Sequence, residues 1–240
     1  MLRIAFMFLR CFFQLPGWYI HICKLCNIEK YDAATRYAYL HKLTPTVNRR
    51  GRVKVECHGI ENLPNETGYV IFPNHQGMFD ALTFLETHER PFVTVMKKEV
   101  KDVPLLRRII TLLQAEIIDR DDIRQSMQVI MNMTRRVKNG ENFIIFAEGT
   151  RSRNGNHLLE FKGGSFKSAM NAKCPIVPVA LIDSFQPFDI RSLRKVTVQI
   201  HYMKPLYYED YKDMKSTEIA ELVAARIQQT IDDAFDKTIE

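Results

Sequence analysis

The chain has 240 residues, of which 46% are apolar and 26% charged, and its formal net charge is +6. This composition is typical of a globular protein with a sizeable core, and it excludes extensive disorder. The basic balance favours an acidic partner, either nucleic acid or an anionic membrane and its lipids. Five cysteines, an odd number, predict no disulfide framework and indicate a reducing cytoplasm. The C-x-x-C at Cys23 and Cys26 has no second pair to complete a zinc site.

The N-terminal segment is strongly apolar. Its pattern is helical, but charged and polar residues keep it short of the ~18 uncharged apolar residues of a membrane-spanning helix. Arg3 and Arg10 lie on one face, where we expect them to meet anionic headgroups. The predicted helices cover residues 2–15, which Pro16-Gly17 breaks, then a stretch from Trp18 onward, then residues 29–43. We therefore expect residues 1–44 to form a helical appendage at a membrane interface. The alternative is that this segment packs as an ordinary helix on the core of the protein.

Residues 45–240 are predicted to form one domain, because strands and helices alternate along them. The predicted strands cover residues 52–58, 69–72, 92–96, 116–120, 142–146, 175–181 and 195–203. One predicted helix starts near Met78 or Asp80, one runs from a cap at Asp121 or Asp122 to Lys138, and the others cover residues 104–114, 165–172 and 216–237. This order favours an α/β domain with a mixed central sheet flanked by helices.

The stretch "NHQGMFD" directly follows a predicted buried strand. His75 and Asp80 can meet if His75 lies in the turn after the strand and Asp80 in the first turn of the next helix, with Gly77 permitting the turn. Asp80 would then accept the imidazole N–H, and the other nitrogen of His75 would be free to act as a general base. The alternative for this motif alone is a helix-capping aspartate beside a hydrogen-bonded loop histidine.

A second polar loop, "FAEGTRSRNG", follows the predicted strand over residues 142–146. Its arginines suit phosphate, because a guanidinium group matches phosphate oxygens bidentately. The loop lacks the spacing of a Walker A motif, and a solvated basic turn is the alternative. The nearby Gly163-Gly164-Ser165 is not a nucleophile elbow, since Lys167 stands where that motif needs glycine.

Taken together, these stretches resemble the glycerolphosphate acyltransferase family, and most closely the 1-acyl-sn-glycerol-3-phosphate acyltransferases within it. Four blocks match in order: N-H-x-x-x-x-D at residues 74–80, "KKEVKDVPLLRRIITLLQAEIIDR", "FAEGTRSR" and "PIVPVAL". Two departures stand out. Ala147 replaces a proline of the third block, and the second block holds Arg107 or Arg108 and residues 114–116 where glycines are usual. The departures put the shape of the pocket in question but leave the histidine and aspartate in place.

The resemblance implies that an acyl group passes from a thioester to the free hydroxyl of a lysophosphatidic acid without a covalent acyl-enzyme. His75 would be the base and Asp80 its partner. The residues expected to hold the acceptor phosphate are Lys97, Arg120 and Arg151, with Gly149 and Thr150 donating from the loop, while Glu148 orders that loop. Strand alternation should turn Lys98 away from Lys97. A surface salt bridge with Asp119 or Asp122 is the alternative for Arg120.

No metal ion or cofactor is expected, and the co-substrate would be an acyl-coenzyme A or an acyl carrier protein. The implied partner is a lipid surface, with the protein bound to the cytoplasmic side of the cell membrane as a monotopic protein. The rival hypotheses are an enzyme of this family with another lyso-lipid acceptor and a non-catalytic lipid-binding protein. Nucleic-acid binding is disfavoured, since the chain has neither zinc-ligand spacing nor an aromatic-glycine RNA signature.

Overall fold

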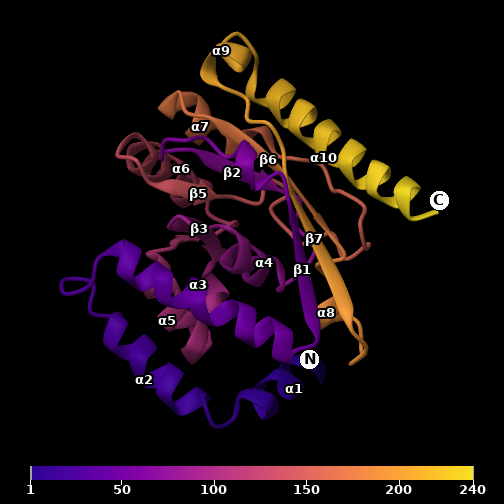
Figure 1. The fold of residues 1–240 in the computed structure, drawn as a ribbon. Coiled ribbons are helices and arrows are strands. Elements are labelled where there is room, and N and C mark those ends of the chain that lie inside the picture. Colours follow the sequence, from indigo (N-terminus) through magenta and orange to yellow (C-terminus); the bar gives the residue numbers. More distant parts are fainter. Residues whose placement is uncertain (1, 240) are drawn as a thin grey trace.

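A computed structural model describes residues 2–239, and side chains through residue 236. Its centre is a seven-stranded sheet in the order β1-β7-β6-β2-β5-β3-β4 (Figure 1). The strands are β1 (Val53–His58), β2 (Val70–Pro73), β3 (Phe92–Lys97), β4 (Glu116–Ile118), β5 (Asn142–Ile144), β6 (Ile176–Ile182) and β7 (Val196–Tyr202). All neighbouring strands are parallel except β6 and β7, which are antiparallel. The predicted α/β domain with a mixed sheet is thus confirmed.

Helices cover both faces of the sheet, because the central strands are apolar on both sides. Val70 and Phe72 of β2 point into the core beneath one group of helices, whereas Tyr69 and Ile71 point into the core beneath the other. The first group comprises α6 (Ile123–Lys138), α7 (Lys167–Ala172) and α10 (Ser216–Ile239). The second comprises α2 (Leu15–Leu25), α3 (Ala33–Arg50), α4 (Asp80–Thr87) and α5 (Pro104–Leu113). The short helices α8 (Gln186–Asp189) and α9 (Tyr208–Tyr211) were not predicted from the sequence.

The N-terminal helices are present, but two of their predicted ends are wrong. Helix α1 (Leu2–Cys11) ends four residues earlier than expected, and Pro16 lies in the first turn of α2, where a proline needs no hydrogen-bonded N–H. Helix α3 continues through Pro45 to Arg50, so the domain boundary expected after residue 44 falls inside a continuous helix. Ile22 and Leu25 of α2 also share a core with β2 and β6.

Arg3 overturns one expectation about α1. Its side chain is only 1% exposed, so it does not face headgroups as predicted. Its guanidinium donates to the backbone carbonyls of Gly51, Pro187, Ser192 and Arg194 at 2.7–3.0 Å. Arg10 remains exposed at the other end of the helix. Arg3 therefore connects α1 to the end of α3, to α8 and to the segment between α8 and β7. The charge pattern of the helix alone could not predict these carbonyl partners.

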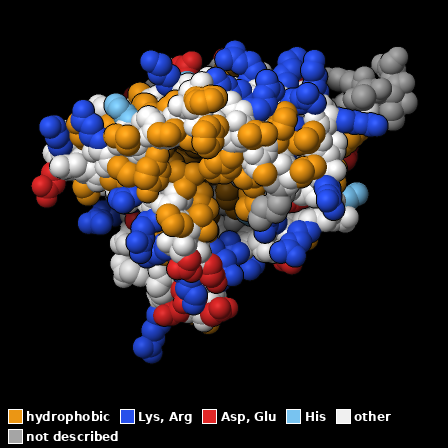
Figure 2. All heavy atoms as spheres, turned by 90° about the horizontal axis from the view of Figure 1, so that it is seen from below, with side chains coloured by type: hydrophobic (Ala, Val, Ile, Leu, Met, Phe, Trp, Pro, Cys, Tyr) orange, Lys and Arg blue, Asp and Glu red, His pale blue; other side chains and the backbone are white. Residues whose placement is uncertain are grey.

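Apolar side chains nevertheless remain exposed on the N-terminal helices. Those with more than 40% exposure are Leu2, Phe8 and Leu9 of α1, Phe12 and Phe13 in the turn that follows it, and Tyr19 and Ile20 of α2. Figure 2 shows apolar side chains gathered around a hollow on the face of the molecule where α1, α2 and α5 lie in Figure 1, with lysines and arginines around them. Within residues 2–239, no helix combines the length and the apolar character needed to cross a bilayer.

Candidate active site

The predicted site residues lie along one edge of the sheet. Strands β2, β5, β3 and β4 are adjacent and parallel, so their carboxyl ends share that edge. His75 follows β2, Glu148 follows β5, Lys97 ends β3 and Arg120 follows β4. Neighbouring strands are ~4.8 Å apart, so these four chain ends are spread over roughly 15 Å. The parallel order thus brings together residues that are far apart in the sequence.

His75 and Asp80 are in direct contact, with 2.7 Å between His75 Nδ1 and Asp80 Oδ2. Asp80 begins α4 and is 1% exposed, whereas the His75 side chain is 18% exposed. Because a carboxylate can only accept, Nδ1 of His75 carries the hydrogen and Nε2 keeps its lone pair. The imidazole also stacks on Phe146, with 4.1 Å between the ring centroids. The side chain that could act as a base is therefore held on two sides.

The carboxylate of Asp80 accepts several hydrogen bonds besides that from His75. The backbone N–H groups of Gln76 and Gly77 donate to it at 2.9 and 3.1 Å, and the hydroxyl of Ser184 donates to Oδ1 at 2.6 Å. Donors of this kind favour the ionised form of a buried carboxyl group. Sequence reasoning missed Ser184, because it lies in a turn after β6 that carries no recognisable motif.

Gly77 and Asn74 shape the turn between β2 and α4. A Cβ atom on Gly77 would stand 3.2 Å from Cα of Phe185, so glycine is needed here for close approach. Asn74 continues the ladder beyond β2 with its side chain, donating to the carbonyl of Leu181 and accepting from its N–H, at 2.9 and 2.7 Å. The turn is thereby fixed against β6 and the segment that follows it.

Glu148 links the loop after β5 to the same turn. The side chain is 2% exposed; Oε1 accepts the backbone N–H of His75 at 2.7 Å and Oε2 accepts that of Leu159 at 3.3 Å. Burial, with a smaller contribution from the negative charge of Asp80, raises the pKa of Glu148 to about 7. Glu148 thus touches the histidine turn as well as its own loop.

The rest of that loop differs in part from expectation. The N–H of Gly149 already donates to the carbonyl of Phe146 at 3.1 Å, so it is not available to a phosphate as predicted. Thr150 is exposed, whereas Arg151 is half-buried and forms no ion pair within 4.0 Å with any side chain of residues 2–236. Lys162 was not singled out from the sequence, yet its Nζ lies 3.0 Å from the position of a Cβ on Gly149. Lys162 therefore adds a cation over the loop.

Lys97 and Arg120 lie at the far end of the edge. Lys97 pairs with Glu99 at 2.8 Å. Lys98 does not follow strand alternation, because a 3-10 helix begins there, and it pairs with Asp119 at 2.6 Å. Arg120 is exposed and, within the described part of the chain, forms no ion pair within 4.0 Å, so the salt bridge considered as its alternative is absent. Its guanidinium is open to an anion.

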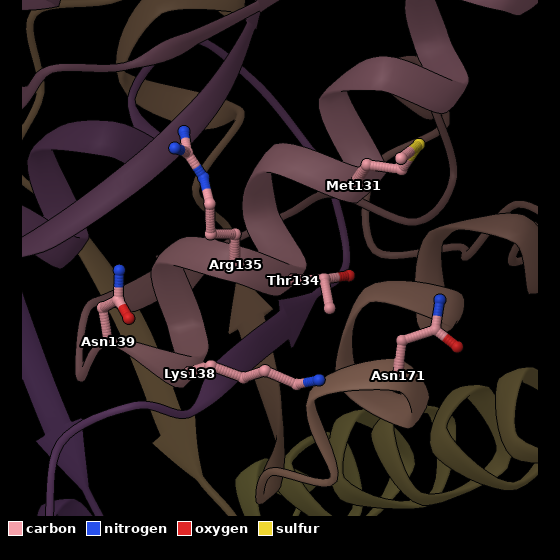
Figure 3. Close-up of a pocket in the computed structure, with 6 residues that line it drawn as sticks. All are labelled: Met131, Thr134, Arg135, Lys138, Asn139 and Asn171. Atoms are coloured by element: carbon pink, nitrogen blue, oxygen red, sulfur yellow. The ribbon is translucent and has the colours of Figure 1, made fainter.

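Hollows also occur away from this edge. One of about 400 Å³ lies between α6 and α7 and is lined by Met131, Thr134, Arg135, Lys138, Asn139 and Asn171 (Figure 3). Lys138 and Asn139 immediately precede β5, which places this hollow at the amino ends of the parallel strands, opposite the His75 edge. It holds none of the predicted site residues. No cluster of metal-ligating side chains occurs in the described residues.

Comparison with known proteins bears on the family to which the chain belongs. The sequence profile of the family described as "Acyltransferase" matches residues 54–182, more than half of the chain. The 1-acyl-sn-glycerol-3-phosphate acyltransferases of Salmonella typhimurium and Escherichia coli are 29% and 28% identical over 180 residues, which is 75% of this chain and 73% of theirs. A probable enzyme of the same name from Mycoplasma pneumoniae is 26% identical over 84% of this chain and 80% of its own.

The fold is also similar to that of a solved structure. The crystal structure of the 1-acyl-sn-glycerophosphate (LPA) acyltransferase PlsC from Thermotoga maritima superposes with a TM-score of 0.78 over 98% of both chains, at 18% sequence identity. At this identity the likeness bears on the fold alone. The matching profile covers both loops and the strands that carry them, and on that ground the chain belongs to the acyltransferase family.

Proposed function

We propose that the protein transfers a fatty acyl group from an acyl thioester to the 2-hydroxyl of 1-acyl-sn-glycerol 3-phosphate, which gives phosphatidic acid. The observation that carries this proposal is the 2.7 Å contact between His75 and a buried Asp80 at the edge where cationic side chains gather. The names of the similar enzymes from Salmonella typhimurium and Mycoplasma pneumoniae support the same acceptor.

In this mechanism His75 is the general base. Its Nε2 removes the proton from the acceptor hydroxyl while the oxygen attacks the thioester carbonyl. Collapse of the tetrahedral intermediate breaks the carbon–sulfur bond, and the imidazolium returns the proton to the departing thiolate. Asp80 stabilises the imidazolium, as a buried aspartate does in hydrolase triads, and the acceptor hydroxyl takes the place of an enzyme serine. No acyl-enzyme and no metal ion is needed for this sequence of steps.

The phosphate of the acceptor is assigned to the cations of the same edge. Arg151 precedes Ser152, whose N–H donates to the carbonyl of His75 at 2.9 Å, and Lys162 lies over the same loop at Gly149. Within the described part of the chain Arg120 has no ion-pair partner within 4.0 Å, whereas Lys97 must exchange Glu99 for the phosphate. Thr150, which is exposed, supplies a hydroxyl. A charge-assisted hydrogen bond to a phosphate contributes roughly 1.5–3 kcal/mol, so two or three such contacts suffice to orient the acceptor.

A lipid surface is the proposed setting, because a lysophosphatidic acid is held in the membrane by ~0.8 kcal/mol per buried methylene. The apolar face in Figure 2 supports binding within one leaflet on the cytoplasmic side. Leu9 of α1 is 73% exposed, and Phe13 in the turn after α1 is 91% exposed, and such large exposed apolar side chains are typical of an interaction surface. Arg10, which is exposed, supplies the headgroup contact that the buried Arg3 does not.

The direct test supplies purified protein with labelled 1-acylglycerol 3-phosphate in vesicles, with acyl-coenzyme A and acyl carrier protein offered separately as donors. Phosphatidic acid from either donor supports the proposal and identifies the donor. An acylated product only from another lyso-lipid would replace the acceptor while keeping the reaction. If neither donor releases thiol with any acceptor, the protein is a non-catalytic lipid-binding member of its family.

A further inference from the structure

Ser184 stands behind the pair formed by His75 and Asp80. Its side chain is completely buried, and its hydroxyl donates to Oδ1 of Asp80, whereas His75 contacts Oδ2. The two carboxylate oxygens of Asp80 therefore hold different partners. We propose that Ser184 is a positioning residue that fixes Asp80 for its contact with His75. This inference rests on the proposed role of His75 as the base.

Ser184 is itself fixed by amide side chains from the two other segments of the site. Its N–H donates to Oε1 of Gln76 at 2.7 Å, and Nε2 of Gln76 donates to Oδ1 of Asn156 at 2.6 Å. Asn156 in turn forms two 2.9 Å hydrogen bonds with Asp183, one to its N–H and one to its carboxylate. These bonds join the turn after β2, the loop after β5 and the turn after β6 into one closed network.

The geometry of Asp183 shows that this network carries a cost. Its φ of 60° lies in the left-handed region, which residues other than glycine adopt only at an energetic cost. The two hydrogen bonds from Asn156 hold the residue in that conformation. The turn directs Ser184 toward Asp80, and strain maintained by surrounding contacts is a recurrent feature of functional sites.

Loss of the Ser184 hydroxyl has a defined electrostatic effect. The N–H groups of Gln76 and Gly77 still donate to Asp80. Without the Ser184 hydroxyl, however, fewer donors neutralise the carboxylate, so more of its negative charge acts on His75. The imidazolium is then stabilised more strongly, so the ring takes up its proton at higher pH. At a given pH, less of the enzyme then carries the neutral ring that can act as a base. The other acids near the turn, Glu148 and Asp189, are unchanged in the variants, so they do not account for a difference.

The test compares Ser184→Ala and Ser184→Thr with the control Ser168→Ala. Ser168 is a second completely buried serine, which lies in α7 outside the site, and its hydroxyl donates to the carbonyl of Ser165. For Ser184→Ala we expect kcat to fall by about tenfold or more, as for one lost hydrogen bond to a charged group, with the acceptor KM changed by less than about twofold. The acid limb of the pH–rate profile should move to higher pH. Ser168→Ala should alter neither, and Ser184→Thr should restore both.

A second readout needs no turnover: the 15N-detected titration of the His75 ring in the full-length protein. Its midpoint should rise in Ser184→Ala and stay in place in Ser168→Ala. A wild-type kcat, pH profile and ring titration in folded Ser184→Ala would overturn the inference. If the wild type transfers no acyl group, the proposed function fails, and the ring titration still decides the role of Ser184. If Ser184→Thr does not fold, the two alanine variants decide it.

Discussion

Glu148 and His75 connect the two loops of the site, because the buried carboxylate of Glu148 accepts the backbone N–H of His75 at 2.7 Å. A side chain from the loop that carries Arg151 thus fixes the backbone of the residue proposed as the base. The loop after β5 and the backbone of His75 are therefore directly coupled, so a substitution that displaces Glu148 should also displace His75.

Replacing the proposed base should stop the reaction. His75→Ala should nearly abolish acyl transfer and leave the fold intact, because the ring is partly exposed and its packing is a stack on Phe146 at the edge of the core. Steady-state turnover with either thioester donor, alongside circular dichroism, checks this. A folded His75→Ala protein that keeps most of its turnover would show that another group removes the proton.

Asp80→Asn should cost less than His75→Ala but still roughly 10²–10⁴-fold in kcat, by analogy with triad aspartates that set the tautomer of their histidine. The asparagine NH2 group would also face either the N–H of Gln76 or the hydroxyl of Ser184. Both of these donate to Asp80 in the wild type, so the substitution destabilises the turn. Turnover should be expressed per folded molecule. A loss of less than about threefold would mean that Asp80 only holds the turn after β2, through the N–H groups of Gln76 and Gly77, and contributes nothing to catalysis.

Glu148 predicts a particular dependence of stability on pH. Because burial raises the pKa of Glu148 from 4.5 to about 7, its proton is bound more tightly in the folded protein than in the unfolded chain. Its contribution to stability is therefore complete below pH 4.5 and is lost as the pH rises through 7. Glu148→Gln removes this contribution, so the melting temperature of the variant minus that of the wild type should increase between pH 5 and pH 8. A difference that stays constant over this interval would contradict the raised pKa.

Arg151→Ala should weaken capture of the phosphorylated acceptor. Loss of a charge-assisted contact of about 1.5–3 kcal/mol corresponds to a rise of roughly 10- to 150-fold in the acceptor KM, with the donor KM nearly unchanged. Arg153→Ala is the matched control, since Arg153 is an exposed arginine of the same loop. Equal effects on both substrates, or equal effects of the two variants, would remove Arg151 from the phosphate site.

Membrane binding is best tested by point substitutions. Deleting residues 1–28 would also remove Arg3, Ile22 and Leu25, which are buried, and would damage the fold. Leu9→Glu with Phe13→Glu changes only exposed side chains of the apolar face and should release the protein from anionic vesicles in a flotation assay. Ile123→Glu is the control, because Ile123 is 75% exposed on α6, across the sheet. Unchanged flotation of the double variant would show that this face is not the anchor.

The regular elements could be predicted from the sequence because they depend on local patterns. Every strand was found from apolar runs or alternation. The α6 cap was expected at Asp121 or Asp122 from residue type, and the structure has it at Asp122, whose side chain accepts from Gln125. The ends that were wrong, at Cys11 and Arg50, depend on tertiary contacts. Leu40 and Tyr37 pack α3 into the core, and this packing outweighs the local penalty of Pro45.

In the site, the pairing of His75 with Asp80 was predictable because both lie within one short motif. Ser184 and Lys162 were not, because their roles depend on which strands are neighbours. β6 lies beside β2, and this places the turn after β6 against Asp80 across 104 positions of sequence. The Gly149 N–H was misassigned for a similar reason, since its partner is set by the curvature of the loop.

The hydrogen bonds between Arg3 and its four backbone carbonyls also constrain the order in which the chain can fold during synthesis. Arg3 and its acceptor at Pro187 are separated by 184 positions, so at ~5–20 residues per second the ribosome needs roughly 10–40 s to make the second after the first. During that time α1 lacks its hydrogen bond to Pro187, so the rest of the protein does not yet fix the direction in which its exposed apolar side chains point. If a lipid surface is near the ribosome, α1 would bind it before the acceptors of Arg3 are synthesised. The sheet would then be completed while α1 is already bound to the lipid.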